Sequence, residues 1–334
     1  MKIRGLFLAF AGLLIVLATP CWADAVKIRM GWVFTPPELP PVFFAKPGVA
    51  KHLGVSYTYE PIHFSSSSPI VTALAAGNVD LSPLTVFTLA AAIQNAKIED
   101  LRILADEFQD GFGDYFSQTF MVRKDSGINR IEDLKGKVFG SIGIGSIAYV
   151  AVRVLLHKHG LEDKRDYSVI EAPSSSLVPM LREKKIDMLA AQGIFFFDPA
   201  LQEIAKPLFT QKDAFGPTET SVFVGRTPFL TANRAAIVDF FEDMLRAVRW
   251  YTDPANRDEA VKIIAEFSKL PPERFSGWIF THQEQYRDPN GMPDLASLQR
   301  VFGIEKDTGL LKRDLIAADY ADLSYIKEAS ARLK

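Results

Sequence analysis

The stretch between residues 134 and 160 constrains the fold most, because it reads as a strand, a glycine turn and a capped helix in direct succession. An apolar, β-branched run precedes Gly143 and Gly145, Ser146 stands where an N-cap is preferred, and Gly160 ends the helical segment that follows. This succession brings free backbone N–H groups to the start of a helix, where the dipole favours an anion. An ordinary strand-to-helix connection has the same pattern. The pattern therefore indicates an anion site only if the chain repeats it elsewhere.

The pattern of helix, Asp-bearing strand, loop and helix recurs at a constant offset. Ser68 corresponds to Ser175, and Asp80 corresponds to Asp187, both 107 residues further on. Two similar α/β lobes that face each other explain this recurrence most simply. Because each aspartate stands at the start of a strand, we expect it to bind nearby backbone N–H groups rather than to act as one of a catalytic pair.

The length of 334 residues suits two lobes followed by a helical C-terminal region. Two extended apolar segments, Phe116–Arg123 and Ser221–Arg226, are interpreted as crossover strands that form a hinge. The predicted division is a signal peptide at 1–25, a first lobe from 26–118 and 222–334, and a second lobe from 119–221. Prolines separate the helices that are predicted after the hinge, at residues 232–252, 257–268, 272–280, 295–302 and 311–331.

The first residues predict export. Lys2 and Arg4 precede an uncharged apolar run at 5–18, and small residues follow at Ala23 and Ala25. This is the arrangement of a signal peptide that is cleaved after one of those alanines. The alternative, a transmembrane anchor, is disfavoured because the apolar run is short for a bilayer.

Cysteine and charge exclude several classes of protein. The only cysteine, Cys21, lies in the predicted signal, and Pro20 stands where a lipoprotein signal needs a small residue. The mature chain therefore lacks disulfides, thiol catalysis and cysteine–metal sites. With 38 basic and 40 acidic residues and no basic run, nothing indicates a nucleic-acid partner. The histidine spacing fits no metal motif, so we expect no metal and no cofactor.

Helix starts in both predicted lobes carry hydroxyl side chains that suit an oxyanion. Thr85 and Ser146 stand at such starts. One helix cap needs only one serine, so the additional serines Ser65, Ser66 and Ser67 are available to a ligand. Ser175 is interpreted as a cap only. Phenylalanines crowd the same loops, and the three in succession at 195–197 cannot all face inward, so one or two are expected to line a cleft.

Two segments give the chain a family resemblance. One is Phe64-Ser65-Ser66 followed by Ala73-Leu74-Ala75-Ala76-Gly77-Asn78-Val79-Asp80. The other is the run from Val122 to Ile128 followed by Glu132-Asp133-Leu134-Lys135-Gly136-Lys137. In these segments the chain resembles the substrate-binding proteins of nitrate-, sulfonate- and taurine-type (SsuA/TauA, NMT1-like) ABC importers. The resemblance covers roughly residues 26–250 and implies an α/β fold of the two-lobed type II periplasmic binding class.

The resemblance also implies where a ligand would bind. The positions are Phe34 and Thr35 after the first strand, Ser65 and Ser66, Gly143, Gly145 and Ser146 at the glycine turn, and Gly193 to Phe195 after the second Asp-bearing strand. Many members carry a tryptophan after that last strand, where this chain has Gly193-Ile194-Phe195. No arginine is placed to clamp an anion, which disfavours small inorganic anions and favours an organic anion with an apolar or aromatic body.

The sequence therefore predicts a soluble, monomeric periplasmic protein that binds a small organic anion, a sulfonate or a carboxylate, and delivers it to the permease and ATPase of an ABC importer. Two alternatives stay open. One is a binder of a neutral heterocycle such as a thiamine-related pyrimidine. The other is a non-transport enzyme on the same fold, which the signal peptide and the lack of a convincing acid–base pair disfavour. The related enzyme branch that makes the thiamine pyrimidine uses a cysteine-rich motif, which a mature chain without cysteine lacks.

Overall fold

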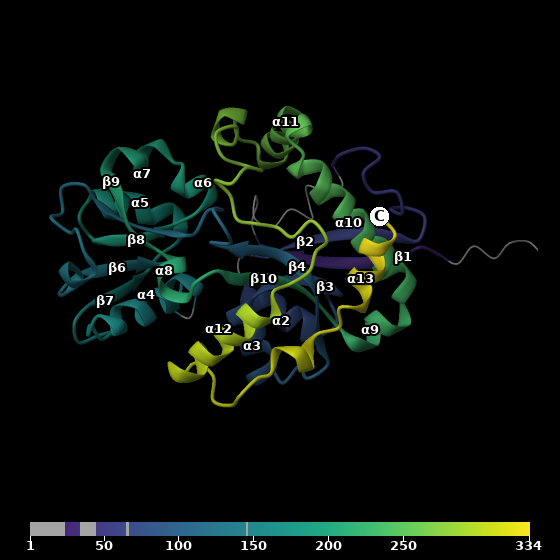
Figure 1. Cartoon of the computed structure of the whole chain (residues 1–334), viewed down its shortest axis with the longest axis horizontal. Helices are drawn as coiled ribbons and strands as arrows, with labels where there is room; N and C mark the ends of the chain where they lie inside the picture. Colours follow the sequence, from purple (N-terminus) through teal and green to yellow (C-terminus); the bar gives the residue numbers. More distant parts are fainter. Residues whose placement is uncertain (1–23, 34–44, 65–66, 145) are drawn as a thin grey trace, which may run out of the picture.

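The computed structural model describes residues 24–33, 45–64, 67–144 and 146–334, and they form two five-stranded sheets, each flanked by helices (Figure 1). The first sheet has the order β2-β1-β3-β10-β4. Its strands are β1 (Val26–Trp32), β2 (Tyr57–His63), β3 (Leu81–Thr85), β4 (Leu101–Asp110) and β10 (Thr218–Arg226). Strands β1, β2 and β3 are parallel, and β10 runs antiparallel to both β3 and β4.

The second sheet repeats this topology in the order β7-β6-β8-β5-β9. Its strands are β5 (Thr119–Arg123), β6 (Val138–Ser141), β7 (Ser168–Glu171), β8 (Met188–Ala191) and β9 (Ala205–Thr210). Strand β6 is parallel to β7 and β8, and β5 is antiparallel to β8 and β9. The α/β architecture with two lobes is the fold class that the sequence predicts.

The offset of 107 residues is a property of the fold as well as of the sequence. Strand β3 begins at Leu81 and β8 at Met188, and the helices that follow them, α3 and α6, begin at Val86 and Gly193. The two aspartates have matching roles, since Asp80 Oδ2 accepts a hydrogen bond from the Arg29 amide at 2.9 Å and Asp187 Oδ2 accepts one from the amide of Val138 at 3.0 Å. The prediction that these carboxylates bind backbone N–H groups is confirmed.

The helices cover both faces of each sheet and enclose three apolar clusters. In the first lobe, α2, α3 and α12 pack on one face of the sheet, and α9, α10, α11 and α13 pack on the other. In the second lobe, α4 covers one face, while α5 and α7 cover the other. The helix bounds are α2 (Ser67–Ala75), α3 (Val86–Gln94), α4 (Ile147–Lys158), α5 (Ser174–Arg182), α6 (Gly193–Phe196), α7 (Pro199–Ile204), α8 (Gln211–Phe215), α9 (Thr227–Ala232), α10 (Arg234–Thr252), α11 (Arg257–Ser268), α12 (Leu295–Asp307) and α13 (Ser324–Ala331). The 3-10 helices are η1 (Ile131–Leu134), η2 (Pro254–Asn256), η3 (Pro272–Arg274) and η4 (Ala317–Tyr320).

The connections between the sheets differ from the predicted crossover strands. Both predicted segments are extended, but β5 pairs only within the second sheet and β10 only within the first. The chain passes between the sheets at residues 111–118 and again at residues 211–217, which include α8. The exact lobe boundaries proposed from the sequence stay a prediction.

Four local expectations are wrong. Ser175, interpreted as a cap, lies inside the first turn of α5, whose N-cap residue is Pro173. Ser82 and Pro83 are residue types that predict a turn, but they lie inside β3, because β3 is held between β1 and β10. The helix expected at 272–280 is limited to the single turn of η3, and the one expected at 311–331 is helical only in η4 and α13. The alternating segment that begins at Val26 forms β1, and the helix predicted at 257–268 is confirmed as α11. The C-terminal helices α10, α11 and α13 pack in one apolar cluster with β1.

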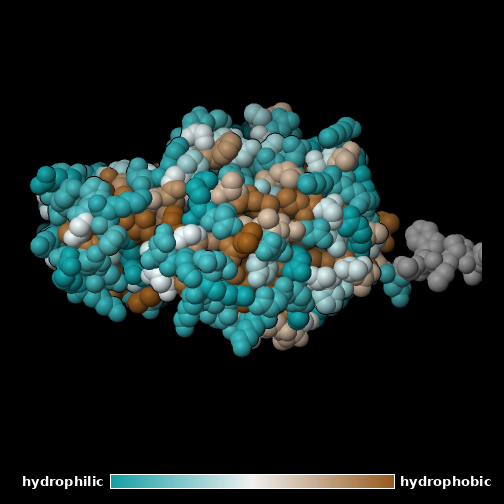
Figure 2. Space-filling model, turned by 60° about the horizontal axis from the view of Figure 1, so that its bottom comes forward, coloured by the Kyte–Doolittle hydropathy of each residue, from teal (hydrophilic) through white to brown (hydrophobic). Residues whose placement is uncertain are grey.

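The face of the molecule shown in Figure 2 is mostly hydrophilic. In the view of Figure 2, hydrophobic residues gather along the middle of the face, with hydrophilic residues around them. No helix among the described residues is long and apolar enough to span a bilayer.

Candidate functional site

Strand order gives each sheet one switch point. In the first sheet, β1 lies between β2 and β3, and in the second sheet β6 lies between β7 and β8. Chain crossings therefore leave in opposite directions at the carboxyl ends of β1 and β6, which is where ligands bind in open α/β sheets. The segment after β1 carries Phe34 and Thr35, which lie outside the described residues, as do Ser65, Ser66 and Gly145. Ser67 begins α2, and its side chain is not described.

In the first lobe, Thr85 ends β3 and caps α3. Its Oγ1 accepts a hydrogen bond from the amide of Thr88 at 3.4 Å and lies 3.0 Å from the hydroxyl of Thr88. The side chain therefore satisfies one of the orphan amides of the first helical turn. The structure places this predicted residue at the carboxyl edge of the first sheet.

In the second lobe, Ser146 caps α4. Its Oγ accepts a hydrogen bond from the amide of Tyr149 at 3.3 Å and lies 3.4 Å from Ser141 Oγ. The amides of Ile147 and Ala148 have no hydrogen-bond partner among the described residues. An acceptor placed at the start of α4 can therefore receive two N–H donors and the favourable dipole of a 12-residue helix.

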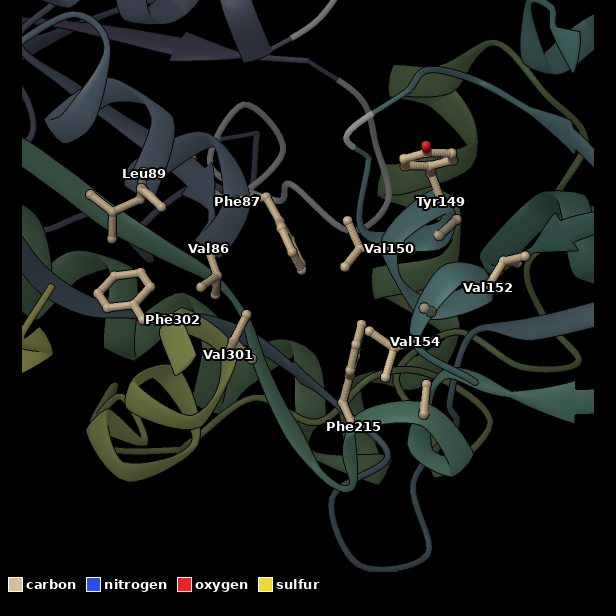
Figure 3. Packing of buried hydrophobic residues seen from close by; sticks show 14 of the residues in the cluster. Val86, Phe87, Leu89, Tyr149, Val150, Val152, Val154, Phe215, Val301 and Phe302 are labelled. Carbon is tan, nitrogen blue, oxygen red and sulfur yellow. The ribbon is translucent and has the colours of Figure 1, made fainter. Parts of the chain in front are cut away.

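The first turns of α3 and α4 face each other across the lobe boundary. Figure 3 shows Phe87 extending from α3 toward Val150 on α4, with Phe215 beside them. The ring centroids of Phe87 and Phe215 are 6.3 Å apart, and both side chains are buried. Side chains from the first turns of both helices thus share one apolar cluster, which suits an anion attached to an apolar body.

A carboxylate of the protein already contacts the glycine turn. The amide of Ile144 donates a hydrogen bond to Glu171 at the end of β7. A Cβ on Gly143 would meet only a Glu171 oxygen at 3.9 Å, which is an ordinary contact, so packing does not demand glycine at that position. Glu171 is exposed, and its charge opposes a second anion at the same turn.

The loop after β8 is held by the C-terminal region. Gly193 has φ +49°, and a Cβ there would meet the indole of Trp278 at 3.4 Å. Phe195 is 41% exposed, whereas Phe197 stacks on Trp278 with centroids 5.3 Å apart. Of the three successive phenylalanines, only Phe195 is thus largely open to solvent.

Further contacts join the segment after β8 to the C-terminal region and to the first connection between the sheets. Arg274 in η3 pairs with Asp198 at the start of α7 at 3.1 Å, and Gln285 donates to the side chain of Gln192 at 3.0 Å. Phe116 and Phe196 make an edge-on contact at 5.0 Å. The C-terminal region therefore bridges both lobes.

A buried polar network links the two connections between the sheets, residues 111–118 and 211–217, to each other. Asp110 accepts hydrogen bonds from the hydroxyl of Ser117 and, at 2.7 Å, from the amide of Gln118. The hydroxyl of Ser117 also accepts a hydrogen bond from the amide of Lys212 at 3.0 Å. Burial raises the pKa of Asp110 to about 6, because the charged carboxylate loses its solvation.

His52, Asp239 and Glu242 are spaced like metal ligands, but their carboxylates are already neutralised by arginines. Ligand atoms of His52, Asp239 and Glu242 lie within 4.8 Å of one another. Arg332 pairs with Asp239 at 2.8 Å and Arg246 pairs with Glu242 at 2.5 Å, so both carboxylates already have cationic partners. We interpret the group as an ion-pair network.

The structure thus places Thr85, Ser146 and Gly143 at the carboxyl edges of the two sheets, with Gly193 and Phe195 in α6 after β8. Sequence reasoning missed Glu171, Phe215 and Trp278. No local signal identifies them, because each reaches the site through a contact distant in sequence.

Comparison with known proteins decides the family. A family model described as the NMT1-like family matches residues 23–265. The chain belongs to the NMT1-like family. This match confirms the resemblance drawn from the two sequence segments, and no relative was found among curated proteins.

Solved structures share the fold of this NMT1-like protein at low sequence identity. The alkanesulfonate-binding protein SsuA from Xanthomonas axonopodis pv. citri, bound to MOPS, has a TM-score of 0.71 at 18% identity, over 90% of this chain and 100% of its own. The periplasmic nitrate-binding protein NrtA from Synechocystis PCC 6803 has a TM-score of 0.68 at 15% identity, over 93% of this chain and 90% of its own. The desulfurization enzyme DSZB has a TM-score of 0.67 at 13% identity, over 92% and 100%. These likenesses show the two-lobed periplasmic binding fold, which both binding proteins and an enzyme use.

Proposed function

We propose that this protein is an exported solute-binding protein that captures a small organic anion between its two lobes and delivers it to an ABC importer. The observation that carries the proposal is a capped helix N-terminus in each lobe, α3 at Thr85 and α4 at Ser146, with Phe87 of α3 directed toward Val150 of α4. Closure of the lobes would let both ends contact one anionic group, so that the ligand favours the closed state.

The surroundings favour a sulfonate or a carboxylate with an apolar or aromatic body. Phe87 and Phe215 supply an apolar floor beside the helix ends. Arg274, in the C-terminal region that bridges the lobes, pairs with Asp198, so its charge is already neutralised and does not serve to bind the anion. Recognition through backbone amides needs no arginine, and membership of the NMT1-like family together with the SsuA and NrtA neighbours supports a solute-binding role. We propose Phe34, Thr35, Ser65, Ser66, Ser67 and Gly145, with the described cleft residues, as the ligand contacts.

The site is tested with matched ligands after native mass spectrometry has searched the purified protein for a carried solute. Benzenesulfonate and benzenesulfonamide have the same ring and nearly the same shape, but only the first is an anion. Calorimetry should show at least ten-fold tighter binding of the anion, about 1.4 kcal/mol. Equal binding, or a preference for the sulfonamide, would instead support a neutral ligand.

The DSZB neighbour favours an enzyme as the second candidate. An enzyme would convert the solute that it binds, whereas a transport protein releases it unchanged. The carried solute, once identified, should be recovered intact after incubation with the protein for many times its dissociation half-life. A new product, followed by mass spectrometry, would contradict the transport role.

A further inference from the structure

A cavity of about 500 Å³ lies away from the facing helix ends. It is enclosed by the end of α10 and the turn η2 on one side, and by residues 280–289 with Tyr115 on the other. None of Thr85, Ser146 and Gly193 lines it. Its volume is in the range of cavities that hold small molecules, roughly 300–1,000 Å³.

Aromatic rings form much of the cavity wall. Tyr251 and Phe280 are stacked with their centroids 5.2 Å apart, and Tyr115 meets Tyr286 edge-on at 5.1 Å. These four side chains come from α10, the connection between the sheets and the C-terminal region. Rings supplied from three places favour a flat aromatic guest, which can stack on one wall and meet the other edge-on.

The charged lining groups balance one another. Arg287 pairs with Glu284 at 2.9 Å, and Arg257 donates to the carbonyl groups of Ile279 and Ser276. Asp253 is the fourth charged group, and its carboxylate accepts the amide of Ala255 at 2.9 Å. His282 also lines the cavity, and its ring pairs with Asp114 at 2.8 Å. With two arginines against two acids and the histidine partnered, the lining offers no surplus charge to an ion, which favours an uncharged guest.

Two polar atoms are available to such a guest. The hydroxyl of Tyr115 has no hydrogen-bond partner among the described residues. Gln285 uses its amide nitrogen to reach Gln192 at 3.0 Å, which leaves its carbonyl oxygen as an acceptor. An aromatic compound that carries one hydroxyl or N–H group would satisfy both the rings and this acceptor.

Phe280 is held in a strained conformation at the cavity wall. Its φ is +57°, a region that a bulky side chain rarely adopts. The carboxylate of Glu284 accepts the Phe280 amide at 2.8 Å and fixes the turn. Strain of this kind is retained where surrounding structure enforces it and gathers at binding sites. Here it presents an aromatic ring to the cavity, where glycine would fit the backbone without strain.

We propose that this cavity is a second binding site, independent of the solute cleft, for an uncharged aromatic compound of one to three rings with a hydroxyl or N–H donor. Phe280, backed by the buried ring of Tyr251, would stack on the guest, and Tyr115 and Gln285 would bind its polar group. Because Tyr115 lies in the connection between the sheets, a bound guest would contact the hinge directly.

The probe is 2-naphthol, with 2-methoxynaphthalene and 2-naphthalenesulfonate as matched compounds that lack the donor or carry a charge. Fluorescence titration should show saturable binding of 2-naphthol at one site and at least five-fold weaker binding of both matched compounds there. Equal binding of the sulfonate at that site would overturn the assignment of an uncharged guest.

Two variants locate the site. Phe280→Gly removes the ring but suits the positive φ, so the turn should be kept, and 2-naphthol should bind at least ten-fold more weakly. Tyr115→Phe removes one hydroxyl and should weaken binding several-fold even if the first variant unfolds. Phe267→Ala, on an exposed ring outside the cavity, is the control and should leave the affinity for 2-naphthol unchanged. Unchanged affinity in both cavity variants, or a crystal structure with the probe elsewhere, would overturn the proposal.

Discussion

Glu305 gives this fold a stability that depends on pH. The side chain lies on α12, which packs against α3, and it is 2% exposed. Its Oε1 has no hydrogen-bond partner in the part of the chain that the structure describes. Burial alone raises the pKa of Glu305 to about 8 from an ordinary value of 4.5. The folded protein therefore keeps this proton at neutral pH, where the unfolded chain has lost it.

The sign and size of the effect follow from this difference. Between pH 4.5 and pH 8 the folded state binds more protons than the unfolded state, so stability falls as pH rises. Each pH unit in this window costs about 1.4 kcal/mol, which sets a ceiling of about 5 kcal/mol for the whole interval. Water that enters the site lowers this ceiling. Glu305→Gln keeps the shape and cannot ionise, so the variant should escape the loss.

Urea unfolding at pH 5 and pH 8 measures the effect. The gain in unfolding free energy of Glu305→Gln over the wild type should grow by several kcal/mol from the lower to the higher pH. Glu203→Gln, at a side chain that is 76% exposed, is the control and should show no such growth. A gain that is the same at both pH values would refute the reasoning, because the carboxyl would then ionise alike in the folded and unfolded chains.

The remaining predictions concern the solute cleft and processing. Ser146→Ala removes the cap of α4 and should cost about 1 kcal/mol of stability in thermal unfolding; an unchanged midpoint would show that the cap contributes nothing. Glu171→Gln removes the carboxylate from the Ile144 amide and should strengthen binding of the anionic solute several-fold by calorimetry, whereas weaker binding would mean that Glu171 helps to hold the ligand. Saturating solute should compact the protein in small-angle scattering without changing its circular dichroism, and no compaction would count against closure of the lobes. N-terminal sequencing should find Asp24 or Val26 first, and an intact Met1 or a lipid on Cys21 would contradict cleavage as predicted.

Local pattern predicts the first part of each lobe well because those elements carry their own signals. The strand, turn and helix around Ser146 lie where glycine and cap residues place them, and α10 and α11 each end shortly before a proline. Strand β4 was missed because Asp106, Glu107 and Asp110 make the segment look polar. Burial raises the pKa of Asp106 and of Glu219 on the paired strand β10, so the folded protein holds a proton there that the sequence pattern does not suggest.

The repeat explains which part of the site could be predicted. Thr85 and Gln192 occupy equivalent places, 107 residues apart, each as the N-cap of the helix after the Asp-bearing strand. Thr85 caps its own helix and was identified from its residue type. Gln192 makes no side-chain cap and instead binds Gln285 of the C-terminal region.

That region has no counterpart in the repeat, and it breaks the symmetry of the two lobes. Through Arg274 and Asp198, and through Trp278 and Phe197, it connects the first lobe to the loops after β8. No comparable bridge joins the facing ends of α3 and α4 among the described residues, where Phe87 and Val150 meet by packing alone. Opening of the lobes therefore disrupts an ion pair and a ring stack on one side but only apolar contacts on the other. We infer that the lobes separate more readily at the anion-binding helix ends, so that the solute enters there.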